Sequence, residues 1–283
     1  MEKKIIGFID HYLNEWHADN YPAWIDEYSG GEFVVKYAYA EVEPTIEGRI
    51  SNREWAEKYG IELLPTIEEL VEKCDAIIVL SPDNSERHYD LSYAALASGK
   101  PVYIDKTFAD TGAEAARIFA VGEAYNSPCF SSSALRFSEK LIPVVREDID
   151  SIVSTGGGHP DTYLIHQLEP IVTLMGSDVT RLMFYGTATA PAWVLMFADG
   201  RCATVTQLAG PAEFVLQINH GAADRNETVV IDDAFFKGLI KAMLHMFRTG
   251  EVPVSHQDTI GIMAIRETCL RAMEQPHKWL VVE

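Results

Sequence analysis

Short apolar runs alternate with amphipathic segments through the first half of the chain. Three runs have the length and the β-branched and aromatic content of buried strands: 4–9 (KIIGFI), 33–41 (FVVKYAYAE) and 75–80 (DAIIVL). Three other segments predict helices, two of them with a Ser or Thr cap and a Glu three residues later: 15–28, 51–59 and 66–73. Strands that alternate with helices through residue 130 predict an α/β, Rossmann-like domain with a doubly wound parallel sheet.

The clearest strand-helix-strand unit spans 75–107. Its first strand ends in the polar turn Ser81-Pro82-Asp83-Asn84, a helix with an apolar face follows, and the second strand ends on Asp105-Lys106. Gly99 is well placed to end the helix. Parallel sheets bind ligands outside the carboxyl ends of their strands. We therefore expect the polar turn and the acid-lysine pair to face one crevice.

The pattern changes near residue 131 to a series of strands followed by two helices. Five segments read as strands: 152–154, 182–186, 193–197, 203–208 and 214–218. Ala198-Asp199-Gly200 predicts a hairpin turn between two of them. One helix is expected to carry Phe235, Leu239 and Met243 on one face, and another to begin at Ser255. The sequence thus predicts a Rossmann-like domain at 1–130 and an α+β domain with a mixed or antiparallel sheet at 131–283.

Composition narrows the classes of partner. With 42 acids against 23 bases, the net charge of −19 repels nucleic acid and anionic membranes. The four cysteines are widely spaced and form no C-x-x-C, which argues against a disulfide framework and fits a reducing cytoplasm. The apolar stretch at the N-terminus is too short for a signal peptide, and no run approaches a membrane span. We expect a cytoplasmic protein with a small-molecule ligand.

The stretch 75–107, DAIIVLSPDNSERHYDLSYAALASGKPVYIDKT, resembles the signature of the Gfo/Idh/MocA family of nicotinamide-dependent oxidoreductases, which act mostly on sugars. Where the family has E-K-P, this chain has Asp105-Lys106-Thr107. The resemblance implies that Lys106 lies beside the nicotinamide and the reacting hydroxyl and assists proton transfer. It implies cofactor contacts for Ser81, Pro82, Asn84, His88 and Asp105. It further implies that the second domain mediates assembly into a homo-oligomer.

A second informative stretch is 156–176, GGGHPDTYLIHQLEPIVTLMG. His166 and Glu169 are three residues apart on a predicted helix, so a carboxylate can orient the imidazole and raise its basicity, as a general base requires. The stretch resembles the family's G-G-G, D, H-x-x-D, G helix, which implies that His166 is the catalytic histidine. The family's upstream aspartate falls on Thr162, and Asp161 is one residue off, which leaves a helix cap as its alternative role.

The glycine-rich loop that binds dinucleotides is missing. After the first strand the chain reads GFIDHYLNEWHADNY, with Asp10, Tyr12 and Glu15 where three glycines belong. Tyr12 would obstruct the close approach of a pyrophosphate, and the two acids would repel it. His17 still matches a histidine often found just beyond this loop in the family.

Three interpretations remain open. The loop residues Asp10 and Tyr12 line a dinucleotide bound in an altered pose, with Glu41 accepting the ribose hydroxyls and favouring NAD over NADP. Alternatively, the chain has lost the dinucleotide and is a non-redox sugar-binding or regulatory protein. In the third, Asp10, His11 and His17 belong to a metal site of a lyase or hydrolase. Under the first, Lys106 and His166 share the proton of a sugar or polyol hydroxyl, Glu169 orients His166, and hydride passes to the nicotinamide.

Overall fold

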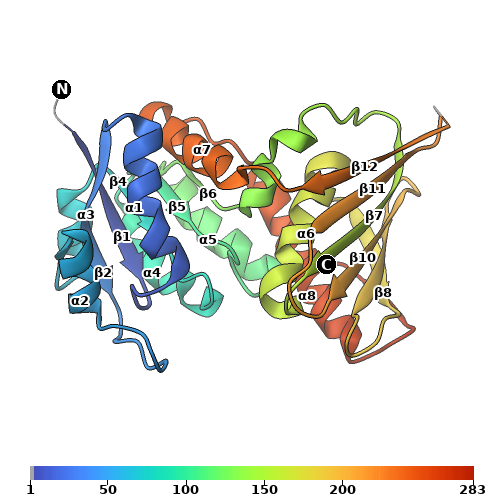
Figure 1. Ribbon diagram of the computed structural model, residues 1–283, viewed down its shortest axis with the longest axis horizontal. Helices are drawn as coiled ribbons and strands as arrows, with labels where there is room; N and C mark the ends of the chain where they lie inside the picture. The colour runs from blue at the N-terminus through green and yellow to red at the C-terminus, as the bar shows by residue number, and fades with distance from the viewer. Residues whose placement is uncertain (1–2, 223) are drawn as a thin grey trace. The chain divides into compact units, whose positions relative to one another are not determined.

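The computed structural model describes residues 3–222 and 224–283. The chain forms two compact units, and each is assembled from separate segments (Figure 1). The first unit comprises Met1–Ala109, Ala116–Ser132 and Leu239–Ser255. The second comprises Asp110–Ala115, Ser133–Gly238 and His256–Glu283.

The first unit is built on a six-stranded parallel sheet with the order β3-β2-β1-β4-β5-β6. Its strands are β1 (Lys4–Asp10), β2 (Phe33–Ala40), β3 (Glu62–Leu63), β4 (Ala76–Val79), β5 (Val102–Ile104) and β6 (Cys129–Phe130). Strand order reverses between β1 and β4, so the two connections leave a crevice at their carboxyl ends. The expected α/β, Rossmann-like fold is confirmed.

Helices of the first unit connect these strands. They are α1 (Trp16–Ser29), α2 (Asn52–Tyr59), α3 (Ile67–Lys73), α4 (His88–Ala97) and α5 (Gly112–Ala124), the last shared with the second unit. The predicted capping box at Ser51 and Glu54 is present, and Thr66 caps α3. Helix α3 lies so close to β1 that a Cβ at Gly7 would meet the Leu70 side chain at 2.4 Å. The sequence did not predict β3, because two residues carry no periodic pattern.

The second unit is built on a seven-stranded sheet with the order β12-β11-β7-β10-β9-β8-β13. The strands are β7 (Ile149–Gly157), β8 (Val179–Phe184), β9 (Ala192–Phe197), β10 (Cys202–Leu208), β11 (Phe214–His220), β12 (Arg225–Ile231) and β13 (Trp279–Val281). Strands β7 and β10 are parallel and the other neighbours are antiparallel. The expected mixed sheet is present, and β12 and β13 are additional to the predicted strands.

Two long helices, α6 (Pro160–Met175) and α8 (His256–Met273), pack against each other and cover one face of this sheet (Figure 1). Helix α6 begins at Pro160, a residue that fits the first helical position. The cap is His159 and not Asp161, whose exposed carboxylate instead contacts the His159 ring at 3.2 Å. Helix α7 (Phe235–Thr249) starts in the second unit and ends in the first. Within the described residues, no helix is both long and apolar enough to cross a membrane.

Candidate functional site

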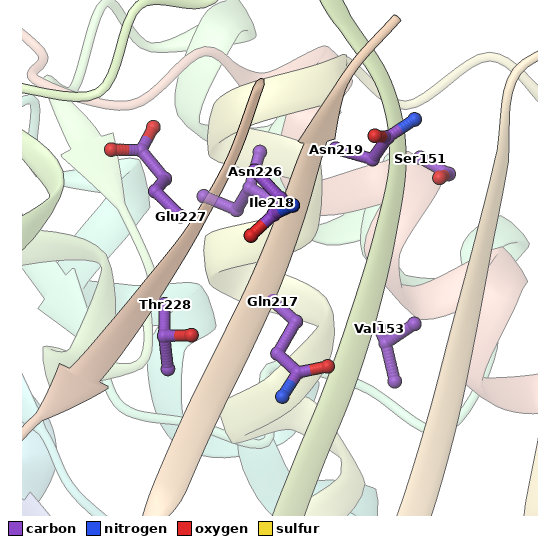
Figure 2. A pocket seen from close by; sticks show the side chains of 8 residues that line it. All are labelled: Ser151, Val153, Gln217, Ile218, Asn219, Asn226, Glu227 and Thr228. Atoms are coloured by element: carbon purple, nitrogen blue, oxygen red, sulfur yellow. The ribbon is translucent and has the colours of Figure 1, made fainter. Parts of the chain in front are cut away.

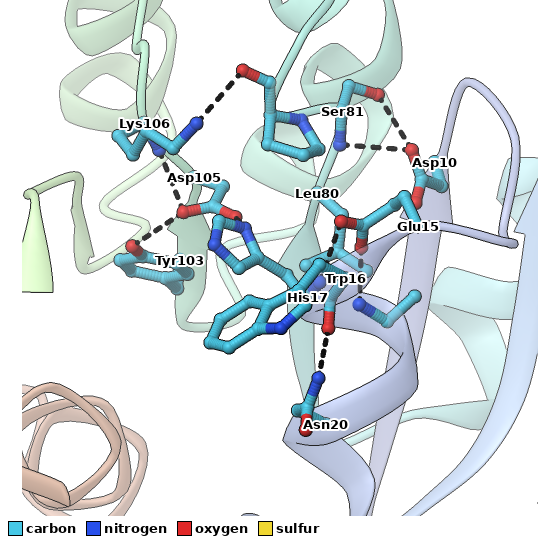
Figure 3. Close-up of polar contacts among 12 residues, drawn as sticks. Asp10, Glu15, Trp16, His17, Asn20, Leu80, Ser81, Tyr103, Asp105 and Lys106 are labelled. Carbon is cyan, nitrogen blue, oxygen red and sulfur yellow. Dashed lines mark hydrogen bonds and ion pairs between the residues drawn. The ribbon is translucent and has the colours of Figure 1, made fainter. Parts of the chain in front are cut away.

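Asp105 directly follows β5 and lies at the centre of a buried network at the carboxyl edge of the first sheet (Figure 3). Its Oδ1 accepts hydrogen bonds from the Lys106 backbone N–H at 2.8 Å and from the Tyr103 hydroxyl at 3.1 Å. Its Oδ2 pairs with Nδ1 of His17. Burial alone would raise the pKa of Asp105 and lower that of His17, but the attraction between them outweighs burial and shifts both the other way. The two side chains therefore form a buried ion pair.

Lys106 lies beside this ion pair and is half-buried. Its ammonium is 3.3 Å from the carbonyl oxygen of Pro82, in the turn after β4. The peptide bond between Lys106 and Thr107 is cis. The two loops that were expected to face one crevice, those after β4 and β5, are thus joined by a lysine that can donate further hydrogen bonds to a ligand.

The crevice between β1 and β4 is bridged by Asp10 and Ser81. Oδ1 of Asp10 accepts from the Ser81 N–H at 3.0 Å and from its hydroxyl at 3.2 Å, while Ser81 Oγ accepts from the His11 N–H at 2.8 Å. These bonds hold Ser81 at a φ of 60°, a left-handed conformation that is unfavourable for a residue with a side chain. Burial raises the pKa of Asp10 to about 8.

Glu15 occupies the N-terminus of α1. Its carboxylate accepts from the backbone N–H groups of His17, at 2.7 Å, and of Ala18. Burial and the nearby Asp10 raise the pKa of Glu15 to about 8, while these two N–H donors favour its ionised form. Oδ2 of Asp10 is buried with no hydrogen-bond partner among the described residues. Asp10 is therefore the better place for a proton shared by the two acids.

Glu41, at the end of β2, is held by Arg87 and His11. Arg87 forms a bidentate pair with its carboxylate at 2.5 and 3.0 Å, and His11 Nδ1 lies 2.7 Å from Oε2. The hydrogen bonds from Arg87 lower the pKa of Glu41. The oxygen atoms that were expected to accept ribose hydroxyls are already hydrogen-bonded within the chain.

His88 is fully buried and contacts the backbone of two separate segments. Its Nδ1 is 2.9 Å from the Phe108 carbonyl oxygen and its Nε2 is 2.7 Å from that of Leu80. Both contacts are to backbone carbonyl oxygens, so the ring connects the loop after β5 to the end of β4. This place differs from the cofactor contact expected for His88.

Two other loop residues remain accessible. The Asn84 amide donates to Glu86 at 3.1 Å, and the ring of Tyr12 lies beneath the Arg49 guanidinium, 4.8 Å from its centre. Both are half-buried and both lie on loops at the carboxyl edge of the sheet. They can still contact a ligand.

In the second unit, Ser133 links His166 to Glu169. The Ser133 hydroxyl is 2.7 Å from His166 Nδ1, and its backbone N–H donates to Glu169 Oε1 at 3.0 Å. The other oxygen of Glu169 accepts from Arg136 Nε at 2.6 Å, and Arg136 also contacts Asp258 at 3.3 Å. The Ser133 hydroxyl thus orients the His166 ring. Glu169 does not contact the ring in this arrangement but holds the backbone of Ser133.

Sequence reasoning missed the residues that neutralise or orient these acids. Arg87, Ser133 and Arg136 all belong to this class. Arg87 stands six residues after Ser81, within the family-like stretch 75–107, so its charge was the available signal. Nothing in the sequence pairs Arg136 with an acid 33 positions later.

The second unit also carries a shallow pocket of about 230 Å³ on β7, β11 and β12, on the sheet face away from α6 (Figure 2). Its lining is mostly polar: Ser151, Val153, Gln217, Ile218, Asn219, Asn226, Glu227 and Thr228. None of the expected catalytic residues lines it. In 3–222 and 224–283, no three His, Cys, Asp or Glu side chains are grouped so that they could hold a metal ion.

Residues 40–131 match the family model described as an oxidoreductase family with an NAD-binding Rossmann fold, GFO_IDH_MocA. The resemblance to the Gfo/Idh/MocA oxidoreductases is confirmed. The matched segment starts at the end of β2 and leaves out β1 and α1, the part of the Rossmann-like domain where a dinucleotide loop would lie. No curated protein matches the sequence.

Solved structures of similar fold cover nearly the whole chain. Scyllo-inositol dehydrogenase from Lactobacillus casei, solved with NAD(H) and scyllo-inositol, is 13% identical with a TM-score of 0.77, and 99% of each chain is covered. Myo-inositol dehydrogenase from Corynebacterium glutamicum is 12% identical with a TM-score of 0.78, covering 100% of this chain and 99% of that one. GenD2 of gentamicin A biosynthesis, solved with NAD, is 10% identical with a TM-score of 0.79, covering 100% and 97%. At 10–13% identity, the similarity to these structures shows the fold alone.

The start of α1 does not meet the requirements of a bound dinucleotide. A pyrophosphate needs N–H groups at the start of α1 and backbone without obstructing side chains. Here Glu15 accepts two of those N–H groups, and Asp10 bridges the crevice to Ser81. The described side chains do not fit the pyrophosphate in this position.

Proposed function

We propose that this protein binds a sugar, polyol or related hydroxylated small molecule at the carboxyl edge of the first sheet, with the Lys106 ammonium donating hydrogen bonds to its hydroxyls and with no hydride transfer. The observation that carries the proposal is the half-buried Lys106 ammonium beside the Asp105–His17 ion pair. The bond from its own N–H to Asp105 fixes the backbone at Lys106, so the side chain starts from a rigid point. An ammonium offers three donors, and Pro82 engages one of them.

An exposed indole supports a sugar-like ligand. Trp16 opens α1 next to His17, and 53% of its surface is exposed, which is high for a tryptophan. Its ring packs against those of His17 and Trp24 in T-shaped contacts, with ring centres 5.2 and 5.6 Å apart, and the exposed part of the indole is an apolar surface that suits the C–H groups of a sugar. A cation and an aromatic face at one edge suit a ligand with hydroxyls on an apolar carbon frame.

Within the second unit, Glu169 is a positioning residue for His166. The Ser133 hydroxyl fixes the orientation of the imidazole, while Glu169 fixes the backbone of Ser133. Glu169 is itself paired with Arg136, at 2.6 Å, which holds its carboxylate in place.

Substitution of Lys106 by methionine is expected to weaken ligand binding by roughly 10- to 100-fold, since a hydrogen bond from a charged donor contributes about 1.5–3 kcal/mol. The measurement is calorimetric titration with a panel of myo-inositol, scyllo-inositol, D-glucose and D-glucitol. Lys36→Met is the matched control, because Lys36 is exposed on β2. Equal affinity of Lys106→Met and the unmodified protein for every ligand that binds would remove Lys106 from the site.

Hydride transfer to a nicotinamide is the second candidate, favoured by the family match over 40–131. Titration with NADH and NADPH, followed by energy transfer from the tryptophans, separates the two functions. Saturable binding near micromolar supports hydride transfer, with Glu41 then favouring NAD. No binding at millimolar cofactor leaves the non-redox function.

A further inference from the structure

The loop between β1 and α1 is fixed by bonds to a distant segment. Arg49 donates to the Asn14 carbonyl oxygen, the Ile50 N–H donates to Asn14 Oδ1 at 2.9 Å, and the Leu13 N–H donates to Asn52 Oδ1 at 2.9 Å. Leu13 is fully buried beneath the loop. These bonds hold the loop in one conformation, so the place of Glu15 at the start of α1 is set by the fold around it.

Glu15 does there what a bound phosphate does at the start of a helix. The first N–H groups of a helix have no partner within it, and their partial positive charge favours an anion. The two oxygens of Glu15 satisfy the N–H groups of His17 and Ala18. The residue is only 6% exposed, so its charge is close to these donors and largely shielded from water.

The neighbouring charges are also matched within the chain. Arg87 is bonded to Glu41 at the end of β2, and His17 is bonded to Asp105 at the end of β5. Asp10 adds a further acid between them, at the crevice. A diphosphate entering here would find the two N–H groups already bonded to Glu15. It would also lie close to acidic side chains, while the nearby cations Arg87 and His17 are already paired with Glu41 and Asp105.

We propose that the chain's own side chains close the dinucleotide site of this fold: Glu15 replaces the pyrophosphate, the Glu41–Arg87 pair occupies the ribose acceptor, and the Asp10–Ser81 bridge fastens the crevice. The closure deepens the non-redox function proposed above, and it stands on different residues from the Lys106 site. It assigns β1 and α1 a structural role in a protein that works without a nicotinamide cofactor.

The test is a gain of binding in the double variant Asp10→Asn/Glu15→Ser. Serine is a good neutral cap and asparagine keeps an acceptor for Ser81, so the fold is preserved while two acidic side chains are removed. The control Asp26→Asn/Glu27→Ser makes the same two substitutions at exposed acids near the other end of α1. ADP and inorganic pyrophosphate are the calorimetric probes, and NADH is followed by energy transfer from tryptophan.

We expect neither the unmodified protein nor the control to bind any probe at a probe concentration of 1 mM, which is on the order of the Kd of a weak complex. We expect the double variant to bind ADP at least tenfold more tightly than either. NADH binding by the unmodified protein at micromolar concentration would overturn the closure. So would a double variant that keeps its circular dichroism spectrum and melting temperature but does not bind ADP. The polyol titrations of Lys106→Met do not depend on NADH or ADP binding, so the proposed function and the closure can each fail without the other.

Discussion

Asp105→Ala is expected to lower the free energy of unfolding of the first unit by about 3–5 kcal/mol, the range for breaking one partner of a buried ion pair. The substitution leaves the His17 imidazolium buried without its counter-charge, and it removes the acceptor of the Tyr103 hydroxyl and of the Lys106 N–H. Without Asp105, burial favours the neutral imidazole, so His17 loses its proton. The raised pKa that Asp105 gives His17 in the folded protein is then lost. This is the largest single effect expected from a substitution in the network.

Hydrogen-exchange mass spectrometry measures this loss within one molecule. Amides of β4 and β5 should exchange faster in Asp105→Ala, while amides of β9 in the second unit serve as the internal reference. Asp105→Asn keeps an acceptor for Tyr103 and should be less destabilising. Asp83→Ala, an exposed acid on the loop after β4, should leave exchange unchanged. Equal effects of the Asp105 and Asp83 substitutions would show that the ion pair is not what stabilises this edge.

Stability of the first unit is expected to fall as the pH rises from 6 to 9. Asp10 and Glu15 have folded-state pKa values raised to about 8, far above those of an unfolded chain, so the folded state holds more protons than the unfolded one in this window. The raised pKa of His17 acts in the same direction. The slope is at most about 1.4 kcal/mol per pH unit for each extra proton held. The lowered pKa of Asp105 has the opposite sign, but its contribution is lost only near pH 4 and below.

Urea unfolding at pH 6, 7.5 and 9, with exchange of β1 and β4 amides as the probe, measures this slope. Asp10→Asn resembles the protonated carboxyl, so it should match the unmodified protein at pH 6 and be more stable at pH 9. Asp26→Asn, on the exposed side of α1, should follow the unmodified protein throughout. A slope for Asp10→Asn parallel to that of the unmodified protein would assign the pH dependence to other groups.

Much of the first unit could be predicted because its local patterns agree with its topology. The runs at 4–9, 33–41 and 75–80 became β1, β2 and β4, and each helix with a capping pattern formed where the cap predicted it. The second unit was predicted less completely. Strand β13 has three residues with little burial, so no alternation of buried and exposed positions marks it in the sequence.

The chemistry of the site was predicted as residue types but not as partners. Asp10 and Glu15 were correctly recognised as acids where glycines were expected. Their bonds depend on contacts of the fold, such as the 71 positions between Asp10 and Ser81. The same holds for Glu41 and Arg87, which are 46 positions apart. A single sequence shows that an acid is present, and only the fold shows which group balances it.

Helix α7 bears on the order in which the protein can be made. Phe247 of α7 packs against Phe33 with ring centres 6.2 Å apart, and Arg248 bonds to Glu32 at 2.8 Å. Both contacts belong to the first unit, which is complete only with residues up to Ser255. During synthesis, the sheet strands of the first unit therefore leave the ribosome long before α7 does. Until then Phe33 lacks its cover, so a gene cut after residue 132 would encode a domain with an apolar gap.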